Sequence, residues 1–192
     1  MVLAIVSKKY HDPNKYLTDI YNGSMRWTGI PAIRIEGPIL PYDDEKFAAV
    51  AARRQGSVVY LSSPGGSIGA AILIAEQVRK LGLDTFAGGG GQGCSSACPL
   101  ILLAGRHVII QRGTPIGFHA SNVAEGTQVM AKYLADLGLT PKQINYLLSI
   151  PNDTMWFPTP ADAAAMLLRW QTVSSLFGAW QSCQAKYCLA VP

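Results

Sequence analysis

Two spacings of apolar residues alternate along the middle of the chain. Short apolar runs predict strands at 32–35, 57–61, 84–87, 107–110 and 116–119. Acids in the first turn and arginines in the last predict a helix at 43–54. Apolar residues three or four positions apart predict a second helix from 68, which Gly82 closes, and a short apolar helix is predicted at 97–104. Strands that alternate with helices in this way predict an α/β domain.

The two ends of the chain differ from this middle part. Residues 1–31 mix polar and aromatic side chains without a period, and we expect an N-terminal extension that packs on the domain or serves as a partner arm. The last third predicts helices, because 125–137 is amphipathic and Thr140 and Thr159 each stand before a proline, as helix caps do. We find no internal repeat and no linker, so residues 32–192 are predicted to form one domain.

Composition narrows the class of protein. Of the 192 residues, 49% are apolar and 15% are charged, which is typical of a globular chain with a sizeable core. The net charge of +4 is spread without a basic block, so nucleic acid is not a predicted partner. No stretch of 18 apolar residues occurs, and no transmembrane segment is predicted.

The loop Ser63-Pro64-Gly65-Gly66-Ser67 follows a predicted buried strand and precedes a predicted helix. Two glycines let the backbone approach a ligand closely, because neither carries a Cβ atom. Backbone amides at the start of a helix can point at a developing negative charge. In isolation, however, this motif is typical of an ordinary strand-to-helix turn.

A second segment brings Ser95 and Ser96 to the start of the short apolar helix. A serine at this position is usually a helix cap, but the position also suits a nucleophile whose following amide, here that of Ala97, binds an oxyanion. His119 ends a predicted strand 23 residues after Ser96. A lone histidine at a strand end is more often structural, and only its combination with the two loops indicates a catalytic base.

Taken together, the blocks 58–67, 96–105 and 106–119 resemble the ClpP-like family of serine peptidases, within the larger ClpP/crotonase fold. The resemblance implies an α/β fold of repeated ββα units, with a mostly parallel sheet, flanking helices and a helical C-terminal third. It implies Ser96 as the nucleophile, His119 as the general base, and the amides of Gly66 and Ala97, next to Gly65, as oxyanion donors. Ser95 is the alternative nucleophile, because the segment 93–96 also resembles a loose nucleophile elbow.

The third catalytic residue is less well defined by the resemblance. The family's acid precedes a short capped helix, and Asp153 is the better match in the corresponding region. Asp162 lies three residues after Thr159, which is typical of a helix start rather than of catalysis. Two further hypotheses are that Asn152 fills this role and that the site has no acidic residue at all.

The sequence also departs from the family. Only 34 residues separate His119 from Asp153, whereas the family has a longer helical segment here, called the handle, through which two rings stack. Sequence features that dock an unfoldase are also not recognisable. We therefore expect no ATPase partner and a smaller homo-oligomer. Apolar side chains late in the chain, such as Trp170, Phe177 and Trp180, favour that association.

Three functions follow as hypotheses. The first is a serine hydrolase that cleaves extended peptides through an acyl-enzyme, without a cofactor. The second is a binding or scaffold protein that keeps the fold but not the activity. The third is a crotonase-type acyl-CoA enzyme, which also stabilises an oxyanion but uses no Ser–His pair.

The four cysteines bear on metal binding and on location. Cys94 and Cys98 are predicted to be small packing residues, because the segment offers too few ligands for zinc. Cys183 and Cys188 flank a short polar loop and are the predicted disulfide. That bond would indicate a periplasmic or exported protein, although the apolar run at 2–6 is too short for a signal peptide.

Overall fold

The computed structural model describes residues 3–6, 32–52, 58–88, 92–166, 168 and 170–173. The main sheet consists of six parallel strands in the order β1-β2-β3-β4-β6-β8. A second sheet pairs the short strands β5 and β7, also in parallel. The bounds are β1 (Leu3–Val6), β2 (Ala32–Glu36), β3 (Val58–Ser62), β4 (Asp84–Ala87), β5 (Cys94–Ser95), β6 (Val108–Gln111), β7 (Ile116–Gly117) and β8 (Gln171–Val173).

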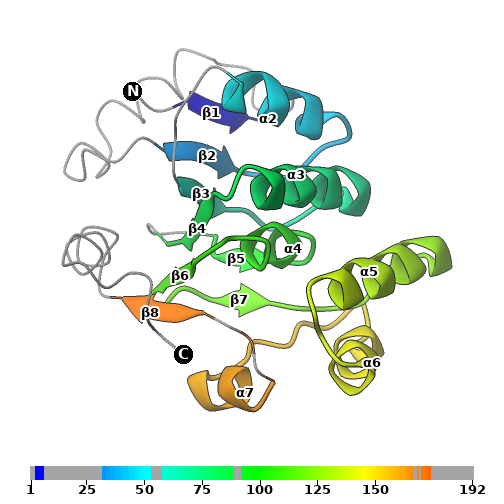
Figure 1. The fold of residues 1–192 in the computed structure, drawn as a ribbon. Coiled ribbons are helices and arrows are strands. Elements are labelled where there is room, and N and C mark those ends of the chain that lie inside the picture. Colours follow the sequence, from blue (N-terminus) through cyan, green and yellow to red (C-terminus); the bar gives the residue numbers. More distant parts are fainter. Residues whose placement is uncertain are drawn as a thin grey trace.

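Helices connect the parallel strands, because a tight hairpin cannot join two strands that run in the same direction. Their bounds are α2 (Asp43–Ala51), α3 (Ile68–Lys80), α4 (Cys98–Leu102), α5 (Ala124–Asp136), α6 (Pro141–Ser149) and α7 (Pro160–Ala165). Figure 1 shows α2, α3 and α4 along one side of the main sheet, with α5 and α6 beside each other after β7. Within the described ranges, no helix is long and apolar enough to cross a membrane.

Both faces of the sheet are buried at its central strands β2, β3, β4 and β6, which explains why these strands are apolar runs. On one face, Val59 and Leu61 of β3 belong to the large core that includes Phe47 of α2. On the other face, the ring of Tyr60 stacks on that of Phe86, with the centroids 5.8 Å apart. Burial on both faces fixes β3, and with it the start of the glycine loop that follows.

The strands and helices predicted in the middle of the chain are confirmed, with shifts at their ends. The helix predicted at 43–54 ends at Ala51, and α4 is shorter than the predicted 97–104. The strand predicted at 116–119 keeps its ladder only to Gly117, after which Phe118 forms a single bridge with Trp156. Apolar runs indicate burial, but where a hydrogen-bond ladder stops depends on the neighbouring strand.

Two short strands at the ends of the sheet were not predicted. Leu3–Val6, within the segment expected to be an N-terminal extension or partner arm, pairs with β2 as an edge strand. Gln171–Val173 pairs with β6, although the last third of the chain is otherwise helical as expected. Strands of three or four residues carry too little periodicity to be recognised, because long-range pairing decides them.

Candidate active site

The loop after β3 is joined to the strand that carries the serines. The amide of Ser63 donates to the carbonyl of Gly93 over 2.8 Å, and the amide of Ser95 donates to the carbonyl of Ser63 over 3.0 Å. The buried hydroxyl of Ser63 also accepts from the amide of Gly65 at 3.1 Å. These bonds place the predicted oxyanion loop beside the predicted nucleophile.

Gly65 and Gly66 occupy positions where no side chain fits. Gly65 has φ +95°, and a Cβ atom there would lie 2.5 Å from Cβ of Ser96 and 2.7 Å from the amide nitrogen of Ala97. Gly66 has φ +142°, and its Cβ would lie 2.1 Å from the carbonyl oxygen of Ile39. Glycine is therefore required at both positions, by backbone conformation and by space.

Ser96 adopts a left-handed backbone conformation, with φ 61°. Among the described residues, only Tyr42 shares a positive φ without being a glycine. Ser96 is not a helix cap, since Ala97 takes that place and makes no side-chain cap bond. A strained serine on a sharp turn between β5 and α4 is the geometry that presents a nucleophile.

The amides of Gly66 and Ala97, the predicted oxyanion donors, have no backbone acceptor among the described residues. Ala97 is only 1% exposed, and a buried amide without an acceptor is uncommon in folded proteins. Both amides border Gly65, and α3 begins one residue beyond Ser67, so its dipole adds positive potential at this point. The arrangement can stabilise a developing oxyanion.

His119 lies in the loop after β7, two residues beyond the glycine whose carbonyl accepts from the Ser96 amide at 2.9 Å. Its Nδ1 is 2.6 Å from the carbonyl oxygen of Ala120. A carbonyl only accepts, so Nδ1 carries a proton, and in the neutral ring Nε2 is then the nitrogen with the lone pair. The Ala120 amide in turn donates to the carbonyl of Ile150 over 2.9 Å, which anchors this loop to the end of α6. No hydrogen bond joins His119 to the Ser96 hydroxyl in the part of the chain that the structure describes.

The predicted acid is not brought to the histidine. Asp153 is exposed in the turn after α6, and among the described residues it makes no hydrogen bond or ion pair with His119. Asn152 is exposed in the same turn. Asp162 accepts from the amide and hydroxyl of Thr159 in a capping box, which confirms its predicted place at a helix start. The side-chain and backbone hydrogen bonds from Thr159 hold the pKa of Asp162 below its usual range.

Cys94 and Cys98 are buried in the core, as predicted for packing residues, but the sequence analysis did not predict that they form a disulfide. Their Cα atoms are 5.2 Å apart, within the usual range for such a bond. The spacing of four residues across a sharp turn was the available sequence clue, but it becomes recognisable only once the turn is known. The predicted pair Cys183 and Cys188 lies outside the described residues.

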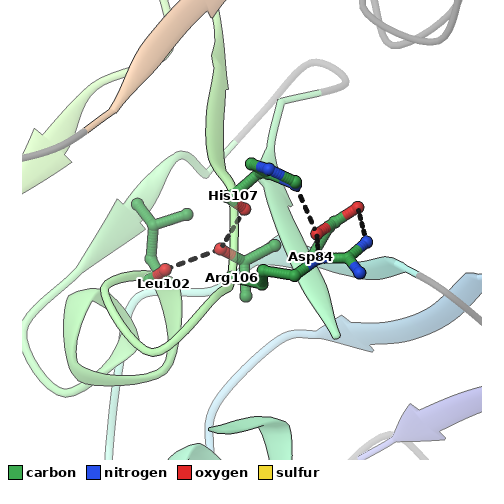
Figure 2. Close-up of polar contacts among 5 residues, drawn as sticks. Asp84, Leu102, Arg106 and His107 are labelled. Atoms are coloured by element: carbon green, nitrogen blue, oxygen red, sulfur yellow. Dashed lines mark hydrogen bonds and ion pairs between the residues drawn. The ribbon is translucent and has the colours of Figure 1, made fainter. Parts of the chain in front are cut away.

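The helix that follows Ser96 is also held at its far end. The buried hydroxyl of Thr85 donates to the carbonyl of Leu102 over 2.6 Å, satisfying one free carbonyl of α4. Figure 2 shows this contact beside the carboxylate of Asp84, which accepts from Arg106 over 3.1 and 3.2 Å and contacts Nδ1 of His107 at 2.9 Å. The position of α4 relative to β4 is therefore fixed.

A groove of about 400 Å³ opens beside the glycine loop. Gly66 lines one side of it, and Val123 and Val129 line the other. Both valines are about half exposed, at 52% and 47%. A larger cavity of about 680 Å³ lies elsewhere, between the ends of α3, α4 and α5, and contains none of the predicted site residues. Of the predicted site residues, Gly66 lines the smaller groove.

Comparison with known proteins supports the fold. No protein-family model and no curated protein matches the sequence. A solved structure of the membrane-bound stomatin-specific protease 1510-N, in a serine-to-alanine variant, aligns with TM-score 0.58 and 16% identity, over 78% of this chain and 82% of that one. A lysine-to-alanine variant of the same protease, in complex with a substrate peptide, gives TM-score 0.59 and 17% identity over 81% and 80%.

A third structure, described only as an enzyme, aligns with TM-score 0.56 and 11% identity, over 75% of this chain and 95% of that one. Identities this low bear on the fold and not on the activity. The parallel order of the main sheet and the helices along it agree with the alignments. The chain therefore has an α/β fold, with a mostly parallel sheet and flanking helices, that matches protease structures of the ClpP/crotonase type.

Proposed function

We propose that this protein is a serine hydrolase that cleaves extended peptides. Ser96 is the nucleophile, His119 is the general base, and the amides of Gly66 and Ala97 bind the oxyanion. The observation that carries this proposal is the left-handed Ser96, packed against Gly65, whose two neighbouring amides at Gly66 and Ala97 lack a backbone acceptor in the part of the chain that the structure describes. Acyl transfer needs a nucleophile and amides that stabilise the oxyanion, and this arrangement supplies both.

The reaction follows from these positions. The Ser96 hydroxyl attacks the substrate carbonyl carbon while Nε2 of His119 takes its proton, and the carbonyl oxygen becomes an anion facing the two amides. Collapse of this intermediate breaks the peptide bond, and the imidazolium returns its proton to the leaving amine. Water then attacks the acyl-enzyme by the same path and releases the acid.

Orientation of His119 is proposed to come from the backbone rather than from an acid. The carbonyl of Ala120 accepts from Nδ1 over 2.6 Å and selects the tautomer that a general base needs. Asp153, which the sequence favours as the third residue, is exposed and is not needed for this step. A neutral carbonyl stabilises an imidazolium less than a carboxylate does, so turnover would be slow.

The groove beside Gly66 supports a peptide as the substrate. Its half-exposed valines, Val123 and Val129, offer an apolar surface next to the oxyanion amides. One of the similar protease structures holds a substrate peptide, which adds fold-level support. A homo-oligomer without an ATPase partner stays a prediction, and the exposed side chains of Leu73 and Val123 are available to an interface.

We also propose an oxidising compartment, either the periplasm or the exterior. The Cys94–Cys98 disulfide supports this location, because disulfides persist mainly where the redox environment is oxidising. This is a different pair from the one on which the sequence-based expectation rested.

A non-catalytic binding protein is the second candidate function. The observation that favours it is the missing hydrogen bond between His119 and Ser96 in the described part of the chain, together with the exposed Asp153. Such a protein would bind peptides in the groove without cleaving them. Covalent labelling separates the two functions.

The test is reaction of the purified full chain with a fluorophosphonate probe, read by intact mass and peptide mapping. Attack by the Ser96 oxygen displaces fluoride, so the expected adduct is on Ser96. Ser96→Ala abolishes it, while Ser95→Ala retains most of it. Labelling that is lost only in Ser95→Ala would overturn the assignment, and an unlabelled folded wild-type chain would favour the binding protein.

The histidine and the acid are tested in the same assay. Removal of a general base typically costs about 100-fold or more in rate, so His119→Asn is expected to label at least that much more slowly. Asp153→Asn is the matched control and is expected to label close to the wild-type rate. A large loss in Asp153→Asn would show instead that this carboxylate reaches the site during the reaction.

A further inference from the structure

The Cys94–Cys98 disulfide closes a ring around the candidate nucleophile. The ring contains Ser95, Ser96 and Ala97, which are the alternative nucleophile, the proposed nucleophile and a proposed oxyanion donor. One cysteine begins β5 and the other begins α4, and both side chains are fully buried. The bond therefore joins the strand and the helix on either side of the turn.

Among the described residues, each ring residue makes a backbone hydrogen bond: the Ser95 amide donates to the Ser63 carbonyl over 3.0 Å, the Ser96 amide donates to the Gly117 carbonyl over 2.9 Å, and the Ala97 carbonyl accepts from the Leu100 amide at 3.2 Å. None of these bonds joins one side of the turn to the other, as the disulfide does. The left-handed conformation of a non-glycine residue costs about 1–2 kcal/mol, so Ser96 would relax toward ordinary backbone angles if it were released. Relaxation would rotate the next peptide and turn the Ala97 amide away from Gly65.

Other contacts cannot replace the bond. The hydrogen bond from Thr85 restrains the far end of α4 and not the turn at Ser96. Gly65 blocks movement of Ser96 toward the glycine loop, but it does not hold the serine from the other side. The disulfide is the covalent restraint on the segment from β5 to α4.

We propose that the Cys94–Cys98 disulfide is a positioning element of the active site, which holds Ser96 in its left-handed conformation and aims the Ala97 amide at the oxyanion. The proposal rests on the proposed hydrolase function. The groove beside Gly66 lies outside the ring, so loss of the bond slows acylation of Ser96 while probe affinity is retained. A bond that only stabilised the fold would not separate these two quantities.

The experiment compares the wild-type chain with Cys94→Ala/Cys98→Ala, at a temperature where circular dichroism shows both to be folded. The maximal rate of fluorophosphonate labelling and the probe concentration at half-maximal rate are measured separately. We expect the maximal rate to fall about tenfold or more, because a small misplacement of a reacting group is costly, with little change in the half-maximal concentration. Cys183→Ala/Cys188→Ala is the matched control and keeps the wild-type rate.

The outcomes separate the two proposals. A folded Cys94→Ala/Cys98→Ala variant that labels at the wild-type maximal rate overturns the positioning role but leaves the hydrolase in place. An oxidised wild-type chain that does not label at Ser96 overturns the hydrolase itself. If the double variant does not fold, the wild-type chain is reduced with dithiothreitol and its thiols are alkylated while the fold is monitored. A folded, alkylated chain that labels normally, or a chain that unfolds on reduction, also overturns the positioning role.

Discussion

At the residue scale, Gly65 leaves no room for a side chain where it faces Ser96. Its ideal Cβ position lies 2.5 Å from Cβ of Ser96 and 2.6 Å from the carbonyl oxygen of Ser95. Neither neighbour is a flexible side-chain end that could move aside, because both belong to the turn between β5 and α4. The glycine thus defines how closely the oxyanion loop approaches the nucleophile.

This contact predicts different effects at two glycines with similar backbone angles. Gly65 and Gly113 have φ +95° and +85°, but a Cβ atom at Gly113 meets nothing within 4 Å. Alanine at either position costs about 1–2 kcal/mol of unfolding free energy through strain. Only Gly65→Ala also displaces Ser96, so its fluorophosphonate labelling is expected to fall about tenfold or more, whereas Gly113→Ala labels as wild type.

Urea unfolding measures the stability of both variants, and the probe measures labelling on the folded fraction. A Gly65→Ala variant that labels as fast as Gly113→Ala would contradict the close approach of the two loops.

The residue scale is also where prediction from the sequence fails. The pattern predicts packing residues at the two cysteines beside Ser96 and an acid at Asp153. The disulfide depends on a turn that brings two Cα atoms to 5.2 Å, and the partner of His119 is a backbone carbonyl. Both features depend on the backbone conformation of a turn, so the four-residue spacing of the cysteines did not by itself indicate the disulfide.

At the element scale, α6 positions the histidine loop through its last turn. The carbonyl of Ile150, which follows α6, accepts from the amide next to His119. The helix begins with a capping box, in which the Thr140 hydroxyl accepts from the Gln143 amide at 3.4 Å and the Gln143 side chain accepts from the Thr140 amide at 2.6 Å. The sequence predicted this start from Thr140 and Pro141 alone.

The cap predicts a measurable loss of stability. Thr140→Ala removes the hydroxyl that accepts at the helix start, which typically costs about 1 kcal/mol of unfolding free energy. Thr127→Ala is the matched control, because Thr127 lies within α5 and only donates its hydroxyl to the carbonyl of Val123. Alanine is a good helix former, so this control is expected to keep the wild-type stability or gain a few tenths of a kcal/mol.

Chemical denaturation curves measure the stability of Thr140→Ala and Thr127→Ala. Equal midpoints for the two threonine variants would mean that the capping box contributes nothing to the fold.

At the scale of the whole molecule, two buried tyrosines link stability to alkaline pH. Burial raises the pKa of Tyr133 and of Tyr60 above the usual 10.0, although Arg79 and Arg34 respectively oppose the shift. The hydroxyl of Tyr133 donates to the carbonyl of Leu100 over 3.1 Å. Both phenols are thus held in their neutral form inside the core.

The sign of the pH effect follows from linkage. Above pH 10 the unfolded chain releases these protons while the folded chain keeps them, so the unfolded state is favoured as the pH rises. We expect the free energy of unfolding to fall steadily above pH 10, and Tyr133→Phe to reduce that slope. Tyr42→Phe is the control, since it also removes one tyrosine hydroxyl but at a side chain that is 72% exposed. An identical slope in Tyr133→Phe and wild type would contradict the buried neutral phenol.

The sequence by itself determined the order of elements and the position of the chemistry along the chain. β4 was predicted with the bounds it has, and the glycine loop, Ser96 and His119 each follow a predicted strand or precede a predicted helix. These features are local, because the burial of a strand, the cap of a helix and the need for glycine at a tight turn depend on a few consecutive residues. Local patterns can be read without knowledge of distant partners.

Only the tertiary structure decided which of these pieces meet. The edge strands β1 and β8 and the contact of Gly65 with Ser96 depend on packing between segments that local patterns do not link. The disulfide around Ser96 and the carbonyl that orients His119 join residues close in sequence, but the backbone conformation of each turn decides whether they form. The energy of such contacts comes from burial and from hydrogen bonds across the fold. The sheet that joins the segments sets the geometry of these contacts, and the pattern of residues along the chain does not indicate that geometry.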